Sequence, residues 1–177
     1  MHRILASITT LEQHLEALRL SPDVYRPQAC PHCGVSGLWG HGCYYRKGDR
    51  STGGATRELV PVPRYLCPEC IGTCSRVPLF MSPRRWYCWA MQQLVLLLLL
   101  SGASLNDCCA RTGRALRTVV RWRDWLDERG ESFAFFLRSR FAELGRIAEH
   151  QAFWRHVIDS MSLAQAMAWL DRELVVP

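Results

Sequence analysis

The chain of 177 residues has no apolar run long enough to cross a bilayer, and it contains no internal repeat or low-complexity tract. Its longest unbroken apolar run covers residues 94–100, whereas a membrane-spanning helix needs about 20 residues. The N-terminus has no long apolar signal segment either. We therefore expect a soluble, cytoplasmic protein with no membrane partner. A hydrophobic content of 49% excludes a disordered or collagen-like chain and suffices for one domain or two small ones.

Lysine is almost missing from the chain. Of the 22 basic residues only Lys47 is a lysine, so the net charge of +6 rests on 21 arginines. The planar guanidinium group suits phosphates and the edges of guanine bases, which favours a nucleic-acid partner. Arginine enrichment can equally reflect genomic base composition, so the charge alone does not decide the matter.

The pattern of apolar residues predicts an α+β fold that is mostly α. Ile8, Leu11, Leu15 and Leu18 follow helical spacing and predict an amphipathic helix over residues 1 to about 22. Residues 30–83 are rich in Gly, Pro and Cys, and two apolar stretches, Tyr44-Tyr45 and residues 60–66, predict short strands around the polar loop 47–56.

From Ser82-Pro83 onward the pattern becomes helical, because serine is a good N-cap and proline suits the first helical position. We expect this helix to end near Leu100, before Ser101-Gly102. Further helices are expected at 104–111, 115–129, 132–149, 151–160 and 163–173. The chain thus divides into an N-terminal helix (1–24), a zinc ribbon (25–82), a helix-turn-helix domain (83–130) and a C-terminal helical region (131–177).

Nine cysteines are many for a cytosolic chain, and an odd number cannot pair completely within one molecule. Four of them form two Cys-x-x-Cys knuckles, Cys30 with Cys33 and Cys67 with Cys70. Four thiolates can surround one Zn²⁺ ion tetrahedrally, and each two-residue gap lets both sulfurs face the same point. Gly34 permits the tight turn after the first knuckle, but the second has Ile71-Gly72, with its glycine one residue late.

Other readings of the cysteines remain open. A lone Cys-Pro-His-Cys is also a redox motif, although here no apolar strand precedes it and a second knuckle exists. Cys74 could replace a ligand, and His41 with Cys43 could form a second site, but neither has a partner at knuckle spacing. We expect His32 to face solvent, and we expect the helical cysteines to be small buried residues: Cys88, Cys108 and Cys109.

Residues 104–122 follow the pattern of a helix-turn-helix. Such a motif needs a small residue where two helices cross, a glycine four positions later in the turn and an apolar anchor six positions beyond. Cys109, Gly113 and Val119 supply these in order. Leu105 and Trp122 complete the small core, with the apolar helix that ends at Leu100 as its third wall. One departure from the pattern is Arg114, which follows the glycine where an apolar residue is usual.

In this interpretation the helix from about Ala115 enters the major groove of double-stranded DNA. We expect Arg117, Val120 and Arg121 to contact bases, and Arg114 and Thr118 to reach phosphates. Residues 104–123 hold five arginines against one acid, Asp107, which gives a net +4. The arginines that complete the predicted DNA surface are Arg111 and Arg123. The alternative is a basic, solvated helical hairpin that only packs against the ribbon.

Arg84 and Arg85 stand beside Trp86, Tyr87 and Trp89. This basic and aromatic group could line the same nucleic-acid surface. The competing reading is that the aromatic side chains join ribbon to helices through their large apolar area, with the arginines exposed.

Several motifs together resemble the N-terminal zinc-binding region of bacterial insertion-sequence transposases and related stand-alone transposon-associated proteins. They are Cys30-Pro-x-Cys33-Gly34, His41-Gly42-x-Tyr44-x-Arg46, Arg64-Tyr-x-Cys67-x-x-Cys70, Pro78-Leu-Phe80 and Pro83-Arg-Arg-Trp-Tyr87. In that group a ribbon precedes a helix-turn-helix that ends in Thr-Val-x-Arg-Trp, here residues 118–122. The resemblance covers about residues 25–125. It places Cys74 at a position that is usually aromatic or apolar, which favours packing over ligation.

The resemblance stops before the catalytic domain of those transposases, which is RNase H-like and uses three acidic residues. Only 47 residues follow Gly130, and Asp159, Asp171 and Glu173 lie on expected helices. We therefore expect no enzymatic activity and no catalytic residue. The C-terminal region is rich in apolar residues, which either fold back over the helix-turn-helix or pair two protomers.

The sequence thus predicts a non-catalytic, zinc-dependent DNA-binding protein of a mobile element, which recognises an element end or a promoter. A separate transposase is a possible partner, and a homodimer is a possible assembly. The main alternative is an adaptor that binds a transposase or polymerase subunit through the ribbon and the C-terminal helices.

Overall fold

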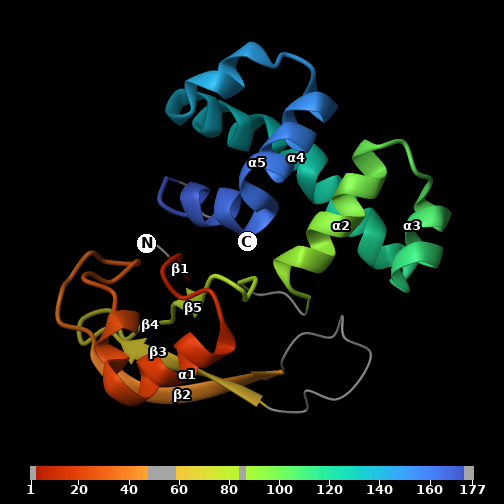
Figure 1. Cartoon of the computed structure of the whole chain (residues 1–177). Coiled ribbons are helices and arrows are strands. Elements are labelled where there is room, and N and C mark those ends of the chain that lie inside the picture. Colours follow the sequence, from red (N-terminus) through yellow and green to blue (C-terminus); the bar gives the residue numbers. More distant parts are fainter. Residues whose placement is uncertain (1–2, 48–58, 84–86, 174–177) are drawn as a thin grey trace. The chain divides into compact units, whose positions relative to one another are not determined.

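The computed structural model describes residues 3–47, 59–83 and 87–173, which form an α+β fold that is mostly α (Figure 1). This confirms the predicted fold class. The chain divides into two compact units: the first extends to Cys88, and the second runs from Trp89 to Glu173. The helix-turn-helix segment and the C-terminal helices therefore belong to the same unit.

The first unit begins with a short strand instead of the expected helix. Strand β1 (Ile4–Leu5) pairs in parallel with β5 (Val77–Pro78). Helix α1 (Leu11–Leu20) starts only after Thr10, whose side chain forms a capping box with Gln13. It is followed by the 3-10 helix η1 (Pro22–Tyr25). The helix predicted over residues 1 to about 22 is thus shorter, because the capping box sets its start.

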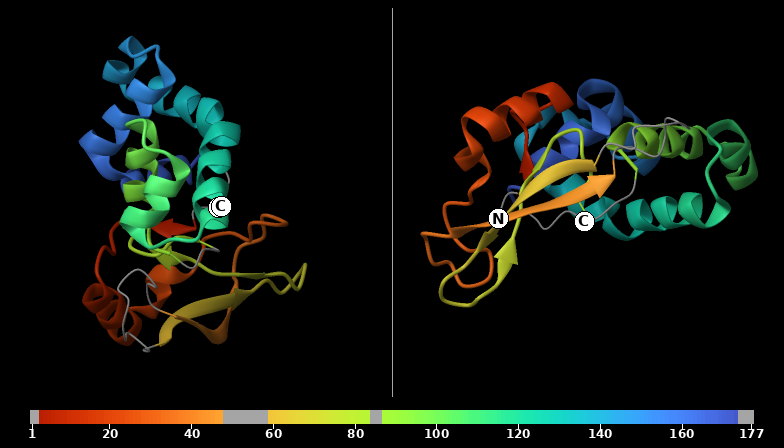
Figure 2. Two further views of the ribbon diagram at one scale, coloured as in Figure 1. Left: turned by 90° about the vertical axis from the view of Figure 1, so that its right-hand side faces the viewer. Right: turned by 90° about the horizontal axis from the view of Figure 1, so that it is seen from below.

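The expected strands around the polar loop are present. Strands β2 (Trp39–Lys47) and β3 (Leu59–Leu66) pair antiparallel as a long hairpin, and β4 (Thr73–Cys74) adds to β3 (Figure 2). The pairing of β2 with β3 shifts register between Gly40 and Cys43. Most of the predicted loop 47–56 lies outside the described residues.

A buried histidine joins α1 to the hairpin and to η1. His14 is fully buried, whereas Leu15, which was expected on the apolar face of the helix, is 47% exposed. The His14 Nε2–H donates to the carbonyl oxygen of Pro61 on β3 at 2.8 Å, because a carbonyl can only accept. The Tyr25 hydroxyl then donates to Nδ1. Burial lowers the pKa of His14, so the folded protein holds this ring neutral.

The second unit is helical throughout. It consists of α2 (Trp89–Leu100), α3 (Leu105–Thr112), α4 (Leu116–Arg140), the 3-10 helix η3 (Ala142–Arg146) and α5 (His150–Leu170). Helix α2 contacts α3, α4 and α5, which explains why most of its residues are apolar. As expected, α2 forms the third wall of the helix-turn-helix core. Within the described ranges, no helix combines the length and apolar character needed to cross a bilayer.

Two helix boundaries differ from the predicted ones. Helix α2 ends at Leu100 as expected but begins at Trp89, so the start predicted at Ser82-Pro83 is wrong. Instead, the Met81 N–H donates to the Pro78 carbonyl in a turn after β5. The separate helices predicted over 115–129 and 132–149 are one helix, α4, followed by η3.

Helix α4 continues through Gly130, although glycine usually weakens a helix, because α5 packs closely against this position. A Cβ atom at Gly130 would lie 2.8 Å from His150 Cε1 and 3.1 Å from Trp154 Nε1. The missing side chain lets α5 approach α4 closely at this point, and the packing gained there offsets the low helix propensity of glycine.

Helix α5 contains the predicted break between 160 and 163. Ser162 has φ 66° and ψ 156°, which is not helical. The break frees the N–H of Leu163, which donates to Gln93 Oε1 on α2 at 2.8 Å. The apolar C-terminal region folds back into this unit, where Phe153, Trp154 and Met167 are fully buried.

We expect His14 to make the fold sensitive to acid. Because its pKa is lowered in the folded state, the unfolded chain takes up a proton below its ordinary pKa of about 6.5 while the folded chain resists protonation. The stabilisation from neutral His14 is therefore present above pH 6.5 and is lost as the pH falls. A His14→Phe variant does not titrate at this position, but it leaves the Tyr25 and Pro61 groups unpaired.

Urea unfolding of wild type and His14→Phe between pH 8 and 5 tests this prediction. The wild type should be more stable at pH 8 by about 1–3 kcal/mol. This advantage should shrink below pH 6.5 by at most about 1.4 kcal/mol per pH unit. Parallel pH profiles for the two proteins would show that His14 is not held neutral.

Candidate metal centre and helix-turn-helix

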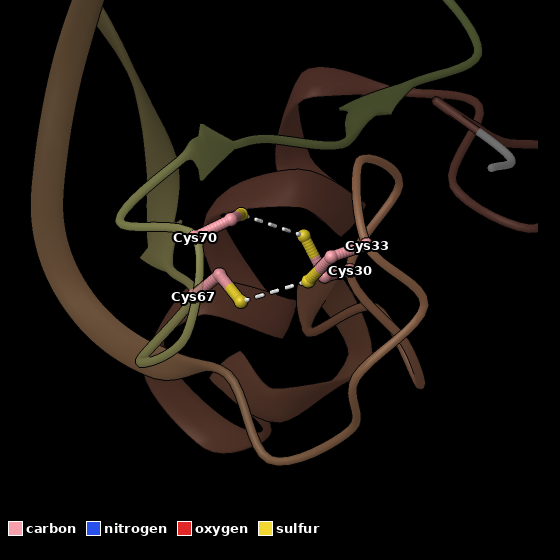
Figure 3. Close-up of side chains that lie close together, drawn as sticks. All are labelled: Cys30, Cys33, Cys67 and Cys70. Atoms are coloured by element: carbon pink, nitrogen blue, oxygen red, sulfur yellow. Dashed lines mark hydrogen bonds between the residues drawn. The ribbon is translucent and has the colours of Figure 1, made fainter.

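The four cysteines of the two knuckles meet at one point, although 33 residues separate the knuckles in the sequence. Cys30 and Cys33 lie in the loop before β2, and Cys67 and Cys70 lie in the turn between β3 and β4 (Figure 3). The Sγ atoms of Cys30 and Cys70 are 3.6 Å apart, and those of Cys33 and Cys67 are 3.5 Å apart. All four sulfurs lie within 4.8 Å of one another, an arrangement compatible with a metal site.

The two knuckles have the same backbone hydrogen bonds. The Gly34 N–H donates to the Cys30 carbonyl at 2.9 Å, and the Ile71 N–H donates to the Cys67 carbonyl at 3.1 Å. In both knuckles the N–H of the first cysteine also donates to the residue five positions on, at 2.8 Å and 2.9 Å. The repeated pattern turns both sulfurs of each knuckle toward the same side.

The late glycine of the second knuckle has a structural consequence. Gly34 takes φ 78° in the first knuckle, and Ile71 takes φ 56° at the matching position of the second. A β-branched residue is strained in this left-handed region. Gly72 is needed for space and not for a left-handed turn. A Cβ there would lie 3.0 Å from the His32 ring and 3.2 Å from Cys70 Sγ, which is too close for an ordinary contact.

The thiols of the cluster influence one another. Desolvation opposes ionisation of Cys30, but hydrogen bonds from the backbone N–H groups of Cys33 and His32, together with those from the Cys70 and Cys33 thiols, lower its pKa to about 6. The backbone at Gly72 lowers the pKa of Cys70, yet desolvation and the neighbouring thiols raise it overall to about 12. The neighbouring thiols thus oppose ionisation of one another, and a cation at this point would favour the thiolate forms.

The remaining candidates for metal ligation do not join the cluster. Cys74 packs in the buried core with Leu5, Tyr25 and Tyr65, and burial raises its pKa to about 11. His32 and Cys43 are exposed. Among residues 3–47, 59–83 and 87–173, the four knuckle cysteines form the only group of three or more potential metal ligands that lie together.

Helices α3 and α4 are joined by the predicted turn at Gly113. Ser104 caps α3 through a capping box with Asp107, and Gly113 ends it with φ 66°. Val119 and Trp122 are buried in the small core as expected. Cys109, expected at the helix crossing, is only partly buried, whereas its neighbour Cys108 is fully buried.

The predicted DNA-contacting residues have different surroundings. Arg111, Arg117 and Arg121 are exposed, while Thr118 and Val120 are partly buried. The Arg114 Nε–H donates to the Thr112 carbonyl at 3.0 Å, within the turn.

Arg123 is engaged by acidic neighbours. Its guanidinium group lies 2.7 Å from Asp124 and 3.9 Å from Asp127. Arg84 and Arg85, predicted to extend the surface, lie outside the described residues.

The N-terminus of α4 has no capping side chain. Its N-cap is Ala115, and its first turn contains no acidic residue. By contrast, α1, α3 and α5 are capped by Thr10, Ser104 and Glu149, respectively. The first N–H groups of α4, at the positive end of the helix dipole, therefore lack a capping side chain and lie among arginines.

Charge is also unevenly distributed within the helical unit. Residues 104–123 carry a net +4, whereas residues 124–173 contain six arginines and nine acidic residues, a net −3. The boundary falls within α4, where Arg117, Arg121 and Arg123 are followed by Asp124, Asp127 and further acidic residues. Positive charge is therefore concentrated at the helix-turn-helix.

No protein-family model, curated protein or solved structure matches the chain. The resemblance to insertion-sequence transposases therefore stays a prediction.

The strained turn of the second knuckle makes a prediction about stability. Replacing Ile71 by glycine removes a left-handed penalty of about 1–2 kcal/mol, partly offset by the extra freedom of glycine in the unfolded chain. We expect Ile71→Gly to raise the melting temperature of the metal-loaded protein.

Gly34→Ile in the first knuckle is the matched reciprocal variant and should lower the melting temperature. Calorimetry of both variants tests the prediction. A lower melting temperature for Ile71→Gly would show that the exposed Ile71 side chain contributes more through its contacts than it costs in backbone strain.

Proposed function

We propose that this protein is a zinc-dependent, sequence-specific binder of double-stranded DNA. In this proposal α3 and α4 form the reading motif, and Cys30, Cys33, Cys67 and Cys70 hold one structural Zn²⁺ ion. The observation that carries the proposal is the N-terminus of α4, which has no capping side chain, no acid in its first turn and arginines on both sides.

This arrangement is unfavourable for a helix that faces only water. Positive side chains near the positive end of a helix dipole destabilise it, and an N-cap side chain would stabilise it by about 1 kcal/mol. A DNA phosphate at this position would satisfy the N–H groups and neutralise the arginines together. The exposed position of Arg117 and Arg121, one turn apart, favours their entry into the major groove.

The roles within the motif follow from the surroundings of each side chain. Arg117 and Arg121 are the candidates for base contacts, and Val120, three residues after Arg117, lies next to Arg117 on the helix surface. In the proposal Arg111, Arg114 and Thr118 contact phosphates. We assign Arg123 to the internal pairing with Asp124 and Asp127 and no longer to DNA.

The chemistry of the cysteine cluster supports zinc as the metal. A tetrahedral ion with Zn–S bonds of about 2.3 Å places its sulfurs about 3.8 Å apart, close to the sulfur separations in the cluster. Four thiolates suit a soft or borderline cation, and Zn²⁺ needs no redox partner. The ion would connect the loop before β2 to the turn after β3 and so stabilise the ribbon.

A role in a mobile element is the most specific part of the proposal. It is supported by the order of two cysteine knuckles and a helix-turn-helix along one chain. The DNA bound would be an element end or a promoter, and a separate transposase is the proposed partner.

The zinc proposal predicts one equivalent of Zn²⁺ per chain. We expect Cys33→Ser and Cys70→Ser to lose most of this metal and to lose cooperative unfolding of the ribbon, because three thiolates cannot complete the tetrahedron. Elemental analysis and the visible spectrum of the Co²⁺-substituted protein report the metal and its sulfur ligands.

Cys43→Ser is the matched control, since Cys43 is exposed on β2 and lies outside the cluster. It should retain metal content and stability. A purified wild-type protein that holds no metal and whose knuckle thiols oxidise reversibly would overturn the proposal in favour of a redox function.

The DNA proposal predicts that zinc-loaded protein enriches one motif from a randomised and genomic pool of duplexes at near-physiological salt. Arg117→Ala and Arg121→Ala together should abolish the enrichment, since a bidentate contact to guanine is worth about 1–3 kcal/mol of discrimination. Arg123→Ala is the matched control on the same helix and should leave the motif unchanged, because Asp124 and Asp127 already engage that side chain.

Two outcomes would contradict the DNA proposal. An unchanged motif in the double variant would exclude α4 as the reader. Weak binding that falls with salt and enriches no sequence would point to the adaptor reading, in which the chain acts through a protein partner.

A further inference from the structure

Helix α4 begins with an exposed apolar residue at the place proposed to face DNA. Leu116, the first residue of the helix, is 49% exposed. It follows the turn at Gly113 directly and was not among the residues expected to contact DNA.

Leu116 belongs to a pair of parallel rows on the helix surface. Leu116 and Val120 are four residues apart and form an apolar row. Arg117 and Arg121 are also four residues apart and form a basic row directly beside it. The start of α4 therefore presents an apolar row and a basic row to the same partner.

These two rows match two features of the major groove. Guanine offers the N7 and O6 acceptors that a guanidinium group binds, and thymine alone among the four bases presents a methyl group there. An apolar side chain gains from contact with that methyl group, whereas it gains nothing from a phosphate.

We propose that Leu116, supported by Val120, contacts the 5-methyl group of a thymine that lies next to a guanine bound by Arg117 or Arg121. Leu116 is thus a specificity-determining residue, and the preferred half-site contains adjacent thymine and guanine. This inference rests on the proposed DNA-binding function and names the chemistry by which it selects a sequence.

Replacing thymine by deoxyuridine tests the inference, because it removes one methyl group and keeps every hydrogen-bonding group of the base. In the motif recovered by selection, each thymine is replaced in turn and binding is measured at fixed salt. We expect one replacement to weaken wild-type binding about fourfold, the equivalent of one buried methyl group. Leu116→Ala should bind the thymine and deoxyuridine duplexes equally.

Two control variants separate this contact from general effects. Leu116→Met keeps an apolar side chain and should restore part of the preference for thymine. Leu15→Ala removes a leucine of similar exposure from α1, 47% against 49%, and should leave both affinity and preference unchanged. Circular dichroism checks that α4 remains helical in each variant.

The outcomes distinguish this inference from the proposed function. A motif whose binding is insensitive to every thymine replacement would overturn the role of Leu116 while leaving sequence-specific binding intact. If the deoxyuridine replacement weakened binding equally for wild type and Leu116→Ala, the methyl contact would belong to another residue, and the proposed role of Leu116 would again be overturned. Failure to enrich any motif would overturn the proposed function and this inference with it.

Discussion

The first unit depends on the meeting of four sulfur atoms that the chain supplies from two distant turns. One knuckle follows η1 and the other links β3 to β4, and their sulfurs approach within 3.5–3.6 Å in two pairs. The buried cluster around Tyr25, Leu38 and Tyr65 also includes Cys30 and Cys67, so two of the four knuckle cysteines are themselves part of the core. A core this small gains little from apolar burial alone. A metal ion at this point would therefore contribute to folding as well as to local geometry.

The second unit combines a well-buried apolar core with one helix start that lacks a stabilising N-cap side chain. Most of its apolar side chains, including Phe133, Trp154 and Met167, are buried among α2, α4 and α5. The start of α4 differs from the rest of the unit, since it has no capping side chain, is flanked by arginines and exposes Leu116. Local choices that lower the stability of a free protein are expected where a ligand supplies the missing interactions. The apolar side chains buried elsewhere in the helical unit offset this loss of stability.

Much of the candidate site could be predicted because it depends on short-range patterns. The spacing within each Cys-x-x-Cys knuckle and the Gly113 turn are local, and the structure has both where the sequence indicated. Errors arose where distant residues decide the outcome. His14 replaces Leu15 on the buried face because Tyr25 and Pro61 offer it two hydrogen bonds. Helix α4 continues through Gly130 because α5 packs against that position. The residues that His14 and Gly130 contact are distant in the sequence, so the local pattern does not reveal them.

The sequence by itself determined the fold class, the strands between the knuckles, the spacing of the two knuckles and the turn at Gly113, since propensity and turn chemistry act over a few residues. Only the tertiary structure shows the two predicted knuckles meeting at one point, and it places Cys74, which the cysteine spacing alone left open, in the buried core. It also decided that the apolar C-terminal region folds back into the helical unit. These outcomes depend on which side chains meet across the fold, and spacing along the chain does not encode that directly.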